Sequence, residues 1–383
     1  MAVSTPKIRV VSWLKGCGFI YVFLKEVMRW PRYLAIEVSR IILAPTRFGH
    51  PVGFYSALEA CALDRIRILI RGQILPELPR RSLIRMAGMD QNGQQPWPIF
   101  TAFIPHARLV GGSLAPMDDR KRLMKEACYG DRYCMDEPSF NQCIPYSSVA
   151  LQGDWTSMTG RFSRGYYHWM TDDLPRLASL RYMPPQTRIL TRAPLRGYQR
   201  ESLRLIGLED RVHPVRGRHF TVERFHFSSP VGMTGCTNPF VVSWLREQYS
   251  GYLRPGTRLP EKLFVLRRGK TRGVMNQEEL AENLICRGWI PIDLEEYSFE
   301  RQIALFASAS HIVAEHGAAL TNLLWCRPGT KVLELCADNF LNGCYEGIAL
   351  CVGLDHRFEI FKADRANGIH VPLERLLGLV EGW

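Results

Sequence analysis

Several short motifs that identify common enzyme classes are missing from this chain of 383 residues. It has no G-x-G-x-x-G turn, which argues against a dinucleotide-dependent oxidoreductase. It has no G-x-S-x-G turn, so a hydrolase built on a nucleophilic serine has no support. No zinc-finger or RRM signature accompanies its basic residues, and a nucleic-acid partner is therefore not expected.

Closely spaced pairs of cysteines are also missing from the sequence. None of the 11 cysteines forms a C-x-x-C pair. Cys128, Cys134 and Cys143 form a loose group, but their spacing fits no common zinc site and no fourth ligand is evident. We interpret the cysteines as free thiols of a reducing compartment, which predicts a cytoplasmic protein.

The chain has no long apolar run near its start. Residues 16–24 are apolar, but about 20 such residues are needed to cross a bilayer. No small-residue cleavage site follows, so a signal peptide has little support. We expect residues 1–50 to be helical. Their aromatic and basic side chains fit either an interfacial helix lying on a membrane or an amphipathic helix packed on the protein.

The overall composition describes a globular, basic protein. Hydrophobic residues make up 46% of the chain, the net charge is +12, and the length suits two domains. A basic excess suits an anionic partner such as a nucleotide diphosphate, an acidic glycan, a membrane surface or nucleic acid. Charge alone does not choose among these partners.

The chain predicts an α/β protein. Residues 85–148 have the punctuation of irregular structure, whereas helical and strand patterns alternate from residue 151 onward. A segment rich in proline and glycine, residues 252–260, is the best candidate for a linker. We therefore predict two Rossmann-like domains facing across a cleft, at residues 51–250 and 255–383.

The most informative segment is His316-Gly317-Ala318-Ala319-Leu320-Thr321-Asn322. It joins a short buried strand, residues 310–314, to a helix, and a second strand follows at 331–335. In such a βαβ unit the turn before the helix binds anions, because free backbone N–H groups and the helix dipole point at the ligand. The sequence therefore predicts a site for a phosphorylated small molecule here.

Two further features would complete this anion site. The basic turn from Arg267 to Arg272 follows the strand at 262–266, and guanidinium groups there can hold a pyrophosphate. Glu334 lies in the strand after the loop helix, where a carboxylate can accept from ribose hydroxyls. The plainer interpretation of the turn is a solvated basic loop. The plainer interpretation of Glu334 is a partly buried structural acid.

The other candidate for chemistry is the pair His168 and Asp172. If their segment is helical, they are neighbours on one face, and a carboxylate can orient an imidazole or act as a base itself. The plainer interpretation is an ordinary helix with a packed histidine. The cluster His311, Glu315 and His316 matches no zinc-protease spacing, so we predict no metal site there.

These segments together resemble glycosyltransferase family 61, in its bacterial branch. The resemblance rests on four blocks, which are Y-Y-H-W-M-x-D-x-L-P-R-L from Tyr166, the positions Arg267, Arg272, Asn276 and Gln302, H-G-A-x-L-x-N from His316, and Pro328-Gly329 followed by Glu334-Leu335. It covers about half of the chain, residues 151–335. Trp325 and Glu315 depart from the residues that many relatives carry.

The resemblance implies a GT-B fold and inverting transfer from a nucleotide sugar. No D-x-D triplet occurs in the chain, so no metal and no other cofactor is expected. Matched positions imply donor contacts from His316, Gly317, Ala318 and Asn322, and contacts to the diphosphate from Arg267 and Arg272. The same comparison puts Asn276 and Glu334 on the donor side, and His168 and Asp172 opposite the acceptor. Our hypothesis is that Asp172 is the base, with His168 as its orienter or alternate.

We therefore predict a glycosyltransferase that moves a sugar from a UDP-linked donor to a glycan or glycolipid acceptor. The resemblance points to bacterial capsule, exopolysaccharide or lipopolysaccharide synthesis, in the cytoplasm or at the inner membrane surface. The alternative is a non-catalytic nucleotide- or glycan-binding protein that keeps the fold.

Overall fold

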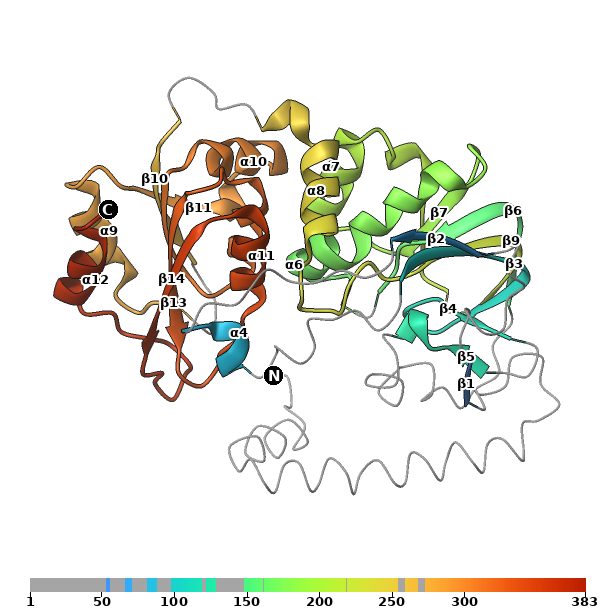
Figure 1. The fold of residues 1–383 in the computed structure, drawn as a ribbon, viewed down its shortest axis with the longest axis horizontal. Helices are drawn as coiled ribbons and strands as arrows, with labels where there is room; N and C mark the ends of the chain where they lie inside the picture. Colours follow the sequence, from blue (N-terminus) through green and yellow to red (C-terminus); the bar gives the residue numbers. More distant parts are fainter. Residues whose placement is uncertain are drawn as a thin grey trace, which may run out of the picture.

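The computed structural model describes residues 53–55, 66–70, 81–87, 98–118, 122–128, 148–160, 162–217, 219–253, 259–267 and 273–383. The N-terminal segment 1–50, predicted to be helical, lies outside these residues, as do Cys134 and Cys143. The described chain forms two β-sheets with helices between and beside them (Figure 1).

The second sheet is entirely parallel. Its strands are β10 (Lys262–Leu266), β11 (Ile290–Asp293), β12 (His311–Glu315), β13 (Lys331–Ala337) and β14 (Asp355–Phe361), in the order β11-β10-β12-β13-β14. The cores of the central strands β10, β12 and β13 are mostly buried apolar residues, as expected for strands covered on both faces. Helices α9 (Gln277–Ile285) and α12 (Leu373–Val380) cover one face, and α10 (Phe299–Ser308) and α11 (Cys344–Val352) cover the other (Figure 1). This confirms the predicted alternation of strand and helix.

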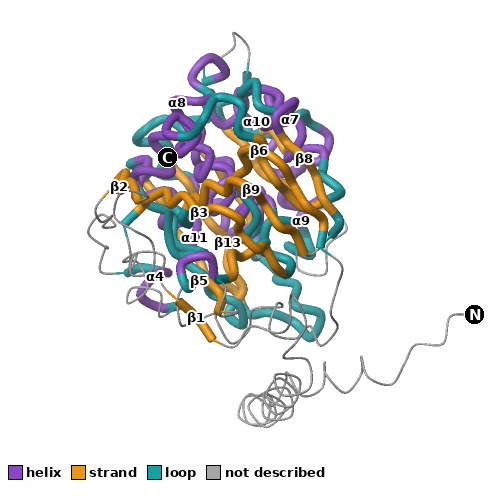
Figure 2. The backbone as a smooth tube through the Cα atoms, turned by 90° about the vertical axis from the view of Figure 1, so that its right-hand side faces the viewer, coloured by secondary structure: helices purple, strands orange, loops and turns teal. Residues whose placement is uncertain are grey.

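The first sheet is mixed. In chain order its strands are β1 (Gly53–Tyr55), β2 (Ile66–Ile70), β3 (Ile99–Val110), β4 (Ala115–Met117), β5 (Arg122–Met124), β6 (Val149–Ser157), β7 (Arg188–Arg192), β8 (Val212–Val215) and β9 (His219–Ser228). Strands β9, β6, β7 and β8 run parallel, whereas β3 pairs antiparallel with β2, β4 and β9. Figure 2 shows β3, β9, β6 and β8 side by side. The α/β class is confirmed, and the antiparallel part was not predicted.

The long strand β3 corrects the prediction that residues 85–148 are irregular. Its 12 residues contain Pro105, which has no N–H for a ladder, and this is why the segment did not resemble a strand. The structure accommodates the proline at an irregularity. His106, the next residue, has a positive φ of 51° and is skipped in the pairing with β9. The register with β9 is the same before and after this point, so the strand stays paired on both sides of the proline without an extra residue.

Helices from the first half pack against helices of the second half. The first group comprises α6 (Tyr166–His168), a π-helical turn η5 (Trp169–Asp173), a 3₁₀ helix η6 (Leu174–Tyr182), α7 (Gly197–Leu205) and α8 (Pro239–Gln248). They meet α10, α11 and the 3₁₀ helix η10 (Ala318–Trp325). The remaining short 3₁₀ turns are η3 (Glu126–Cys128), η7 (Glu209–Arg211), η8 (Ser250–Tyr252) and η9 (Leu294–Glu296). None of the helices in the described ranges combines the length and apolar character needed to cross a bilayer.

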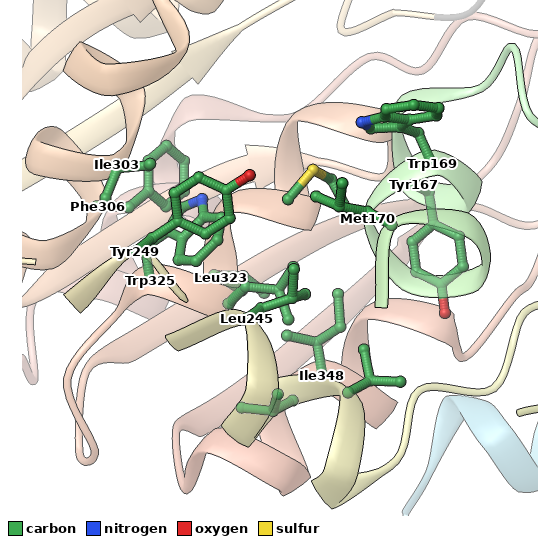
Figure 3. Close-up of a cluster of buried hydrophobic side chains, with 14 of the residues drawn as sticks. Tyr167, Trp169, Met170, Leu245, Tyr249, Ile303, Phe306, Leu323, Trp325 and Ile348 are labelled. Atoms are coloured by element: carbon green, nitrogen blue, oxygen red, sulfur yellow. The ribbon is translucent and has the colours of Figure 1, made fainter. Parts of the chain in front are cut away.

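One hydrophobic core runs through this junction. It contains Trp169 and Met170 from the first half and Phe306, Leu323 and Trp325 from the second (Figure 3). The ring centroids of Tyr249 and Trp325 lie 5.3 Å apart. Because the packing is continuous across the change of sheet, the predicted domain limits at 51–250 and 255–383 stay a prediction.

A distant segment of the chain is fixed to this second half. Helix α4 (Leu83–Met86) lies against the start of α11, where the buried Glu346 carboxylate accepts from Ser82 Oγ at 2.9 Å and from Ile84 N at 2.8 Å. Gly343 permits the contact, because a Cβ there would come within 2.5 Å of Ile84. Residues 81–87 are therefore built into the second half despite their early position in the chain.

Replacing Glu346 with alanine should detach this segment. The change orphans two donors, Ser82 Oγ and Ile84 N, and each orphaned donor costs about 1–3 kcal/mol. We expect the free energy of unfolding in urea to fall by roughly 2–4 kcal/mol. Glu282→Ala, at an exposed position in α9, is the control and should change it little. Equal effects of the two substitutions would contradict the anchoring role of Glu346.

Candidate active site

The strand order of the second sheet creates a crevice. The chain passes from β10 to β11 on one side and then returns to β12 on the other side of β10. Open α/β sheets bind ligands at such a switch point, outside the carboxyl ends of the strands. A cleft of about 960 Å³ lies there, and residues from both halves of the chain line it. Gly317 and Ala318, from the βαβ turn that the sequence predicted, form part of its wall.

Arg267 directly follows the last residue of β10 and lines this cleft. Its Nη1 donates to the carbonyl oxygen of His316 at 3.0 Å and to Glu315 Oε1 at 3.3 Å. Gly317 provides the space, because a Cβ there would lie 3.0 Å from Arg267 Nη1. The structure thus brings Arg267 and Gly317 together in the cleft wall, as the sequence predicted. Arg272 lies outside the described residues.

The turn after β12 leads into η10 at the cleft. Ala318 is the first residue of this helix, and Gly317, Ala318 and Ala319 all line the cleft. The first N–H groups of a helix have no partner within the helix, so this end is suited to an anion.

Asn322 has a different role from the one predicted. Its Oδ1 accepts from Tyr166 Oη at 2.8 Å and from Trp325 Nε1 at 3.1 Å, and its Nδ2 donates to Gln302 Oε1 and to the carbonyl of Ala319, both at 3.1 Å. The amide is therefore occupied on both sides. Asn322 lines the cleft but serves to join the two halves, because Tyr166 belongs to the first half.

Asn276 also differs from its predicted place at the donor. Its side-chain amide bridges to the backbone of Val371, donating to the carbonyl at 2.9 Å and accepting from the N–H at 3.1 Å. It is not part of the cleft lining. This residue connects the start of α9 to the segment before α12, which is a structural task.

His316 is held by a buried carboxylate. Its Nδ1 lies 2.5 Å from Glu334 Oε1, and His356 Nε2 lies 2.8 Å from Glu334 Oε2. Burial alone would raise the pKa of Glu334, but the hydrogen bonds from His316 and His356 outweigh it and hold that pKa well below its usual range. Since Glu334 is fully buried with both oxygens engaged, it is out of reach of ribose hydroxyls, contrary to the sequence prediction.

The same cluster includes the groups best placed to ligate a metal. Ligand atoms of His316, Glu334 and Cys336 lie within 4.8 Å of one another. The two histidines already satisfy the carboxylate, and burial raises the pKa of the Cys336 thiol well above its ordinary value, which disfavours the thiolate that a metal requires. Hydrogen bonding accounts for this arrangement.

The second histidine–carboxylate pair lies in the first half. His168 Nδ1 is 2.8 Å from Asp172 Oδ2, so the predicted pairing one turn apart is confirmed. Asp172 also accepts from Thr234 Oγ1 at 2.6 Å and from Thr171 Oγ1 at 2.9 Å. The side chain of His168 is 29% exposed and that of Asp172 only 7%, so the imidazole is the accessible member of the pair.

The surroundings of His168 raise the pKa of its imidazole ring. Burial lowers the pKa of the ring, but the hydrogen bond and the negative charge of Asp172 outweigh burial and raise that pKa above its ordinary value of 6.5. With Asp172 ionised, Nδ1 carries the ring proton of the neutral form. The lone pair then lies on Nε2, away from Asp172.

A row of aromatic rings connects the two histidines. The centroid distances are 5.4 Å from His168 to Tyr167, 5.8 Å from Tyr167 to Tyr345, and 4.9 Å from Tyr345 to His316. His168 also packs on Gly165, where a Cβ would approach its ring carbon Cδ2 to 3.2 Å, and Gly165 lines the cleft. Each half thus contributes one carboxylate-bound histidine beside the cleft, and neither His168 nor His316 is among the residues that line it.

The first half adds cleft residues that sequence reasoning missed. Arg164 and Arg196 are exposed on the cleft wall, and Tyr198 lies between them, donating from its Oη to the carbonyl of Arg164 at 2.9 Å. The sequence did carry a signal for them, which is an arginine directly before a glycine at the start of a helix. Arg164 precedes Gly165, and Arg196 precedes Gly197. These positions become neighbours only in the folded chain.

Gly317→Ala tests the packing of Arg267. The added Cβ should displace the guanidinium, and because hydrogen bonds to charged groups contribute about 1.5–3 kcal/mol, we expect inorganic pyrophosphate to bind roughly 10-fold more weakly. Isothermal titration calorimetry measures this directly. Gly378→Ala is the control, since its Cβ would meet nothing within 4 Å. Unchanged pyrophosphate affinity in Gly317→Ala would remove Arg267 and this turn from the anion site.

Comparison with known proteins agrees with this geometry. Residues 166–333 match the model of the family described as glycosyltransferase 61. An 84-residue stretch is 36% identical to protein O-linked-mannose beta-1,4-N-acetylglucosaminyltransferase 2 of Tetraodon nigroviridis. That match covers 21% of this chain and 14% of the relative, so the chain spans only a small part of the curated relative's length. Residues 166–333 make up less than half of the chain, and over this segment the chain is similar to glycosyltransferase family 61.

Proposed function

We propose that this protein is an inverting glycosyltransferase that takes a sugar from a nucleotide-sugar donor. The observation that carries the proposal is the pairing of a basic switch-point crevice with an accessible, carboxylate-bound histidine, both within the segment that matches the family. The crevice suits a phosphorylated donor, and the histidine suits removal of a proton from an acceptor hydroxyl.

The donor diphosphate is proposed to lie against Arg267 and the first N–H groups of η10. Arg164 and Arg196 add positive charge from the opposite wall. Donors fixed in this way stabilise the charge that develops on the leaving diphosphate, and removing one such donor typically costs about 10²–10³ in rate. Because the chain has no D-x-D triplet, the proposal assigns this stabilisation to side chains and backbone rather than to a metal.

His168 is the proposed base, and Asp172 its positioning residue. This reverses the hypothesis made from the sequence. Both Asp172 oxygens already accept hydrogen bonds within the protein, whereas Nε2 of the partly exposed imidazole is turned away from that carboxylate. A base must reach the proton it removes, so accessibility favours the histidine.

In the proposed reaction the acceptor oxygen attacks the anomeric carbon from the face opposite the diphosphate. The new C–O bond forms as the bond to the diphosphate oxygen breaks. The hydroxyl proton moves to His168 Nε2, and the leaving diphosphate carries away the bonding electrons. Asp172 holds the imidazole in the correct tautomer and stabilises the imidazolium that results.

His316 is proposed to contact the diphosphate or the transferred sugar. Glu334 fixes its Nδ1, which leaves Nε2 for the ligand. The assignment of Glu334 is therefore to orient His316, in place of the direct contact with ribose that the sequence suggested. His356 completes the hydrogen bonding of the same carboxylate.

The finer features rest on the family resemblance. We propose a GT-B arrangement of the two halves, a UDP-linked hexose or pentose donor, and a glycan or glycolipid acceptor of bacterial capsule, exopolysaccharide or lipopolysaccharide synthesis. We place the reaction in the cytoplasm, with attachment to the inner membrane surface as a further proposal. Support for the donor class comes from the anion-binding geometry of the cleft.

Substitution of His168 tests the proposed base. His168→Ala should lower kcat/KM by roughly 10²–10⁴, the usual contribution of a general base, while donor binding stays intact. The wild-type kcat/KM should fall as pH drops through the raised pKa of His168, because protonation removes the Nε2 lone pair. Purified protein with a UDP-sugar and an acceptor oligosaccharide, assayed for released UDP, provides the measurement.

Asp172→Asn separates the two possible bases. If His168 is the base, the loss of the carboxylate lowers its pKa, so the acid limb of the profile moves to lower pH and partial activity remains. If Asp172 were the base, its substitution would be as damaging as His168→Ala. His370→Ala, at an exposed position, is the matched control. Donor binding without hydrolysis or transfer under any condition would favour a non-catalytic binding protein.

A further inference from the structure

We propose that Asp293, at the carboxyl end of β11, binds the ribose hydroxyls of the donor nucleotide. This inference rests on the proposed function and assigns a part of the same cleft that neither the sequence nor the family resemblance had indicated. It replaces Glu334, which is enclosed in the protein, with an acid that lines the cleft.

The sheet brings Asp293 to the anion site. In the parallel pairing of β10 with β11, Asp293 is the partner of Leu266, the residue directly before Arg267. The end of β11 therefore lies beside the end of β10, and Asp293 and Arg267 line the same cleft. In nucleotide-binding α/β sheets, an acid near the phosphate-binding turn accepts hydrogen bonds from the ribose hydroxyls.

Only one oxygen of the Asp293 carboxylate has a hydrogen-bond partner among the described residues. Its Oδ1 accepts from the N–H of Glu295 at 3.0 Å, which fixes the side chain at the start of η9. Within the described part of the chain no hydrogen bond engages Oδ2. The side chain is partly exposed, so this second oxygen can accept from a ligand.

Three other acids line the cleft, of which Glu295 is exposed, and Glu201 and Glu315 have structural partners. Glu201 accepts from the N–H of Phe299 at 2.8 Å and so caps α10 from the first half. Glu315 holds Arg267 and accepts from the N–H of Val274 at 3.2 Å. Asp293 differs from both, because it keeps an acceptor for a ligand.

The charge pattern of the cleft favours a nucleoside diphosphate over a simple phosphate. An acid beside an anion site opposes binding of the anion unless the ligand also brings hydrogen-bond donors. A ribose brings hydroxyl donors at a fixed distance from its diphosphate. Tyr297 and Tyr198 line the same cleft and provide ring surface for the attached base.

Ribose discrimination tests the inference. We would measure binding of UDP, GDP, their 2′-deoxy counterparts and inorganic pyrophosphate to the full chain by calorimetry. For the nucleotide that binds, the wild-type protein should prefer the ribose form over the 2′-deoxy form by roughly 10-fold, since the lost hydrogen bond is to a charged group. Pyrophosphate reports the anion site separately from the nucleoside.

Asp293→Asn is the informative variant. Asparagine keeps a side-chain oxygen for the N–H of Glu295 but replaces the second acceptor with an amino group. The ribose preference should fall close to 1, with pyrophosphate affinity unchanged. Glu296→Gln, an equal change of charge at an exposed neighbour that does not line the cleft, should keep the full preference.

Four results would overturn the assignment. A wild-type protein that binds UDP or GDP without discriminating the 2′-deoxy form does not use Asp293 in this way, although the proposed donor class would survive. A preserved preference in Asp293→Asn, or a loss of pyrophosphate binding in that variant, would assign Asp293 to loop structure alone. Failure of every nucleotide to bind the wild-type protein would count against the proposed function as well.

Discussion

The hydrogen bond from Tyr166 to Asn322 is the contact on which the arrangement of the site depends. It crosses from the first half to the second at the floor of the cleft, and Asn322 continues it to Gln302. Gln302 in turn donates to the carbonyls of Leu294 and Tyr297, which form the loop after β11. The amides of Asn322 and Gln302 thereby link the helix that carries His168 to the loop that follows Asp293. The buried environment of Asn322 makes this coupling strong, since any member left unpaired would cost about 1–3 kcal/mol.

Both candidate histidines follow the same design. Each has its Nδ1 bound to a carboxylate of its own half, Asp172 for His168 and Glu334 for His316. A carboxylate fixes the tautomer and the direction of Nε2, so each ring would present a defined donor or acceptor to a bound ligand. The two pairs differ in accessibility. Glu334 is fully buried and shared with His356, whereas the Asp172 pair opens to solvent through His168.

Local patterns predicted the second half well, and long-range contacts decided the rest. The strands and helices predicted between residues 262 and 335 were correct, as was the turn at His316 to Ala318, because each depends on neighbours in sequence. The spacing of His168 and Asp172 likewise specified a contact within one turn. The roles of Glu334 and Asn322 could not be predicted, because their partners His356 and Tyr166 lie 22 and 156 residues away. Pro105 concealed β3, since a strand that contains a proline can be identified only from its pairing with the partner strand.

The continuous core between the halves constrains how the cleft can respond to a ligand. Rotation of one half against the other would separate Tyr249 from Trp325 and Phe299, and exposing apolar surface costs about 25 cal/mol per Å². It would also break the Tyr166–Asn322 bond and uncap α10 by withdrawing Glu201. Exposed side chains on the cleft wall, such as Arg164 and Arg196, can move without these losses. We therefore expect ligand-induced closure to come chiefly from those side chains, so that the distance between the donor crevice and His168 is already set in the folded chain.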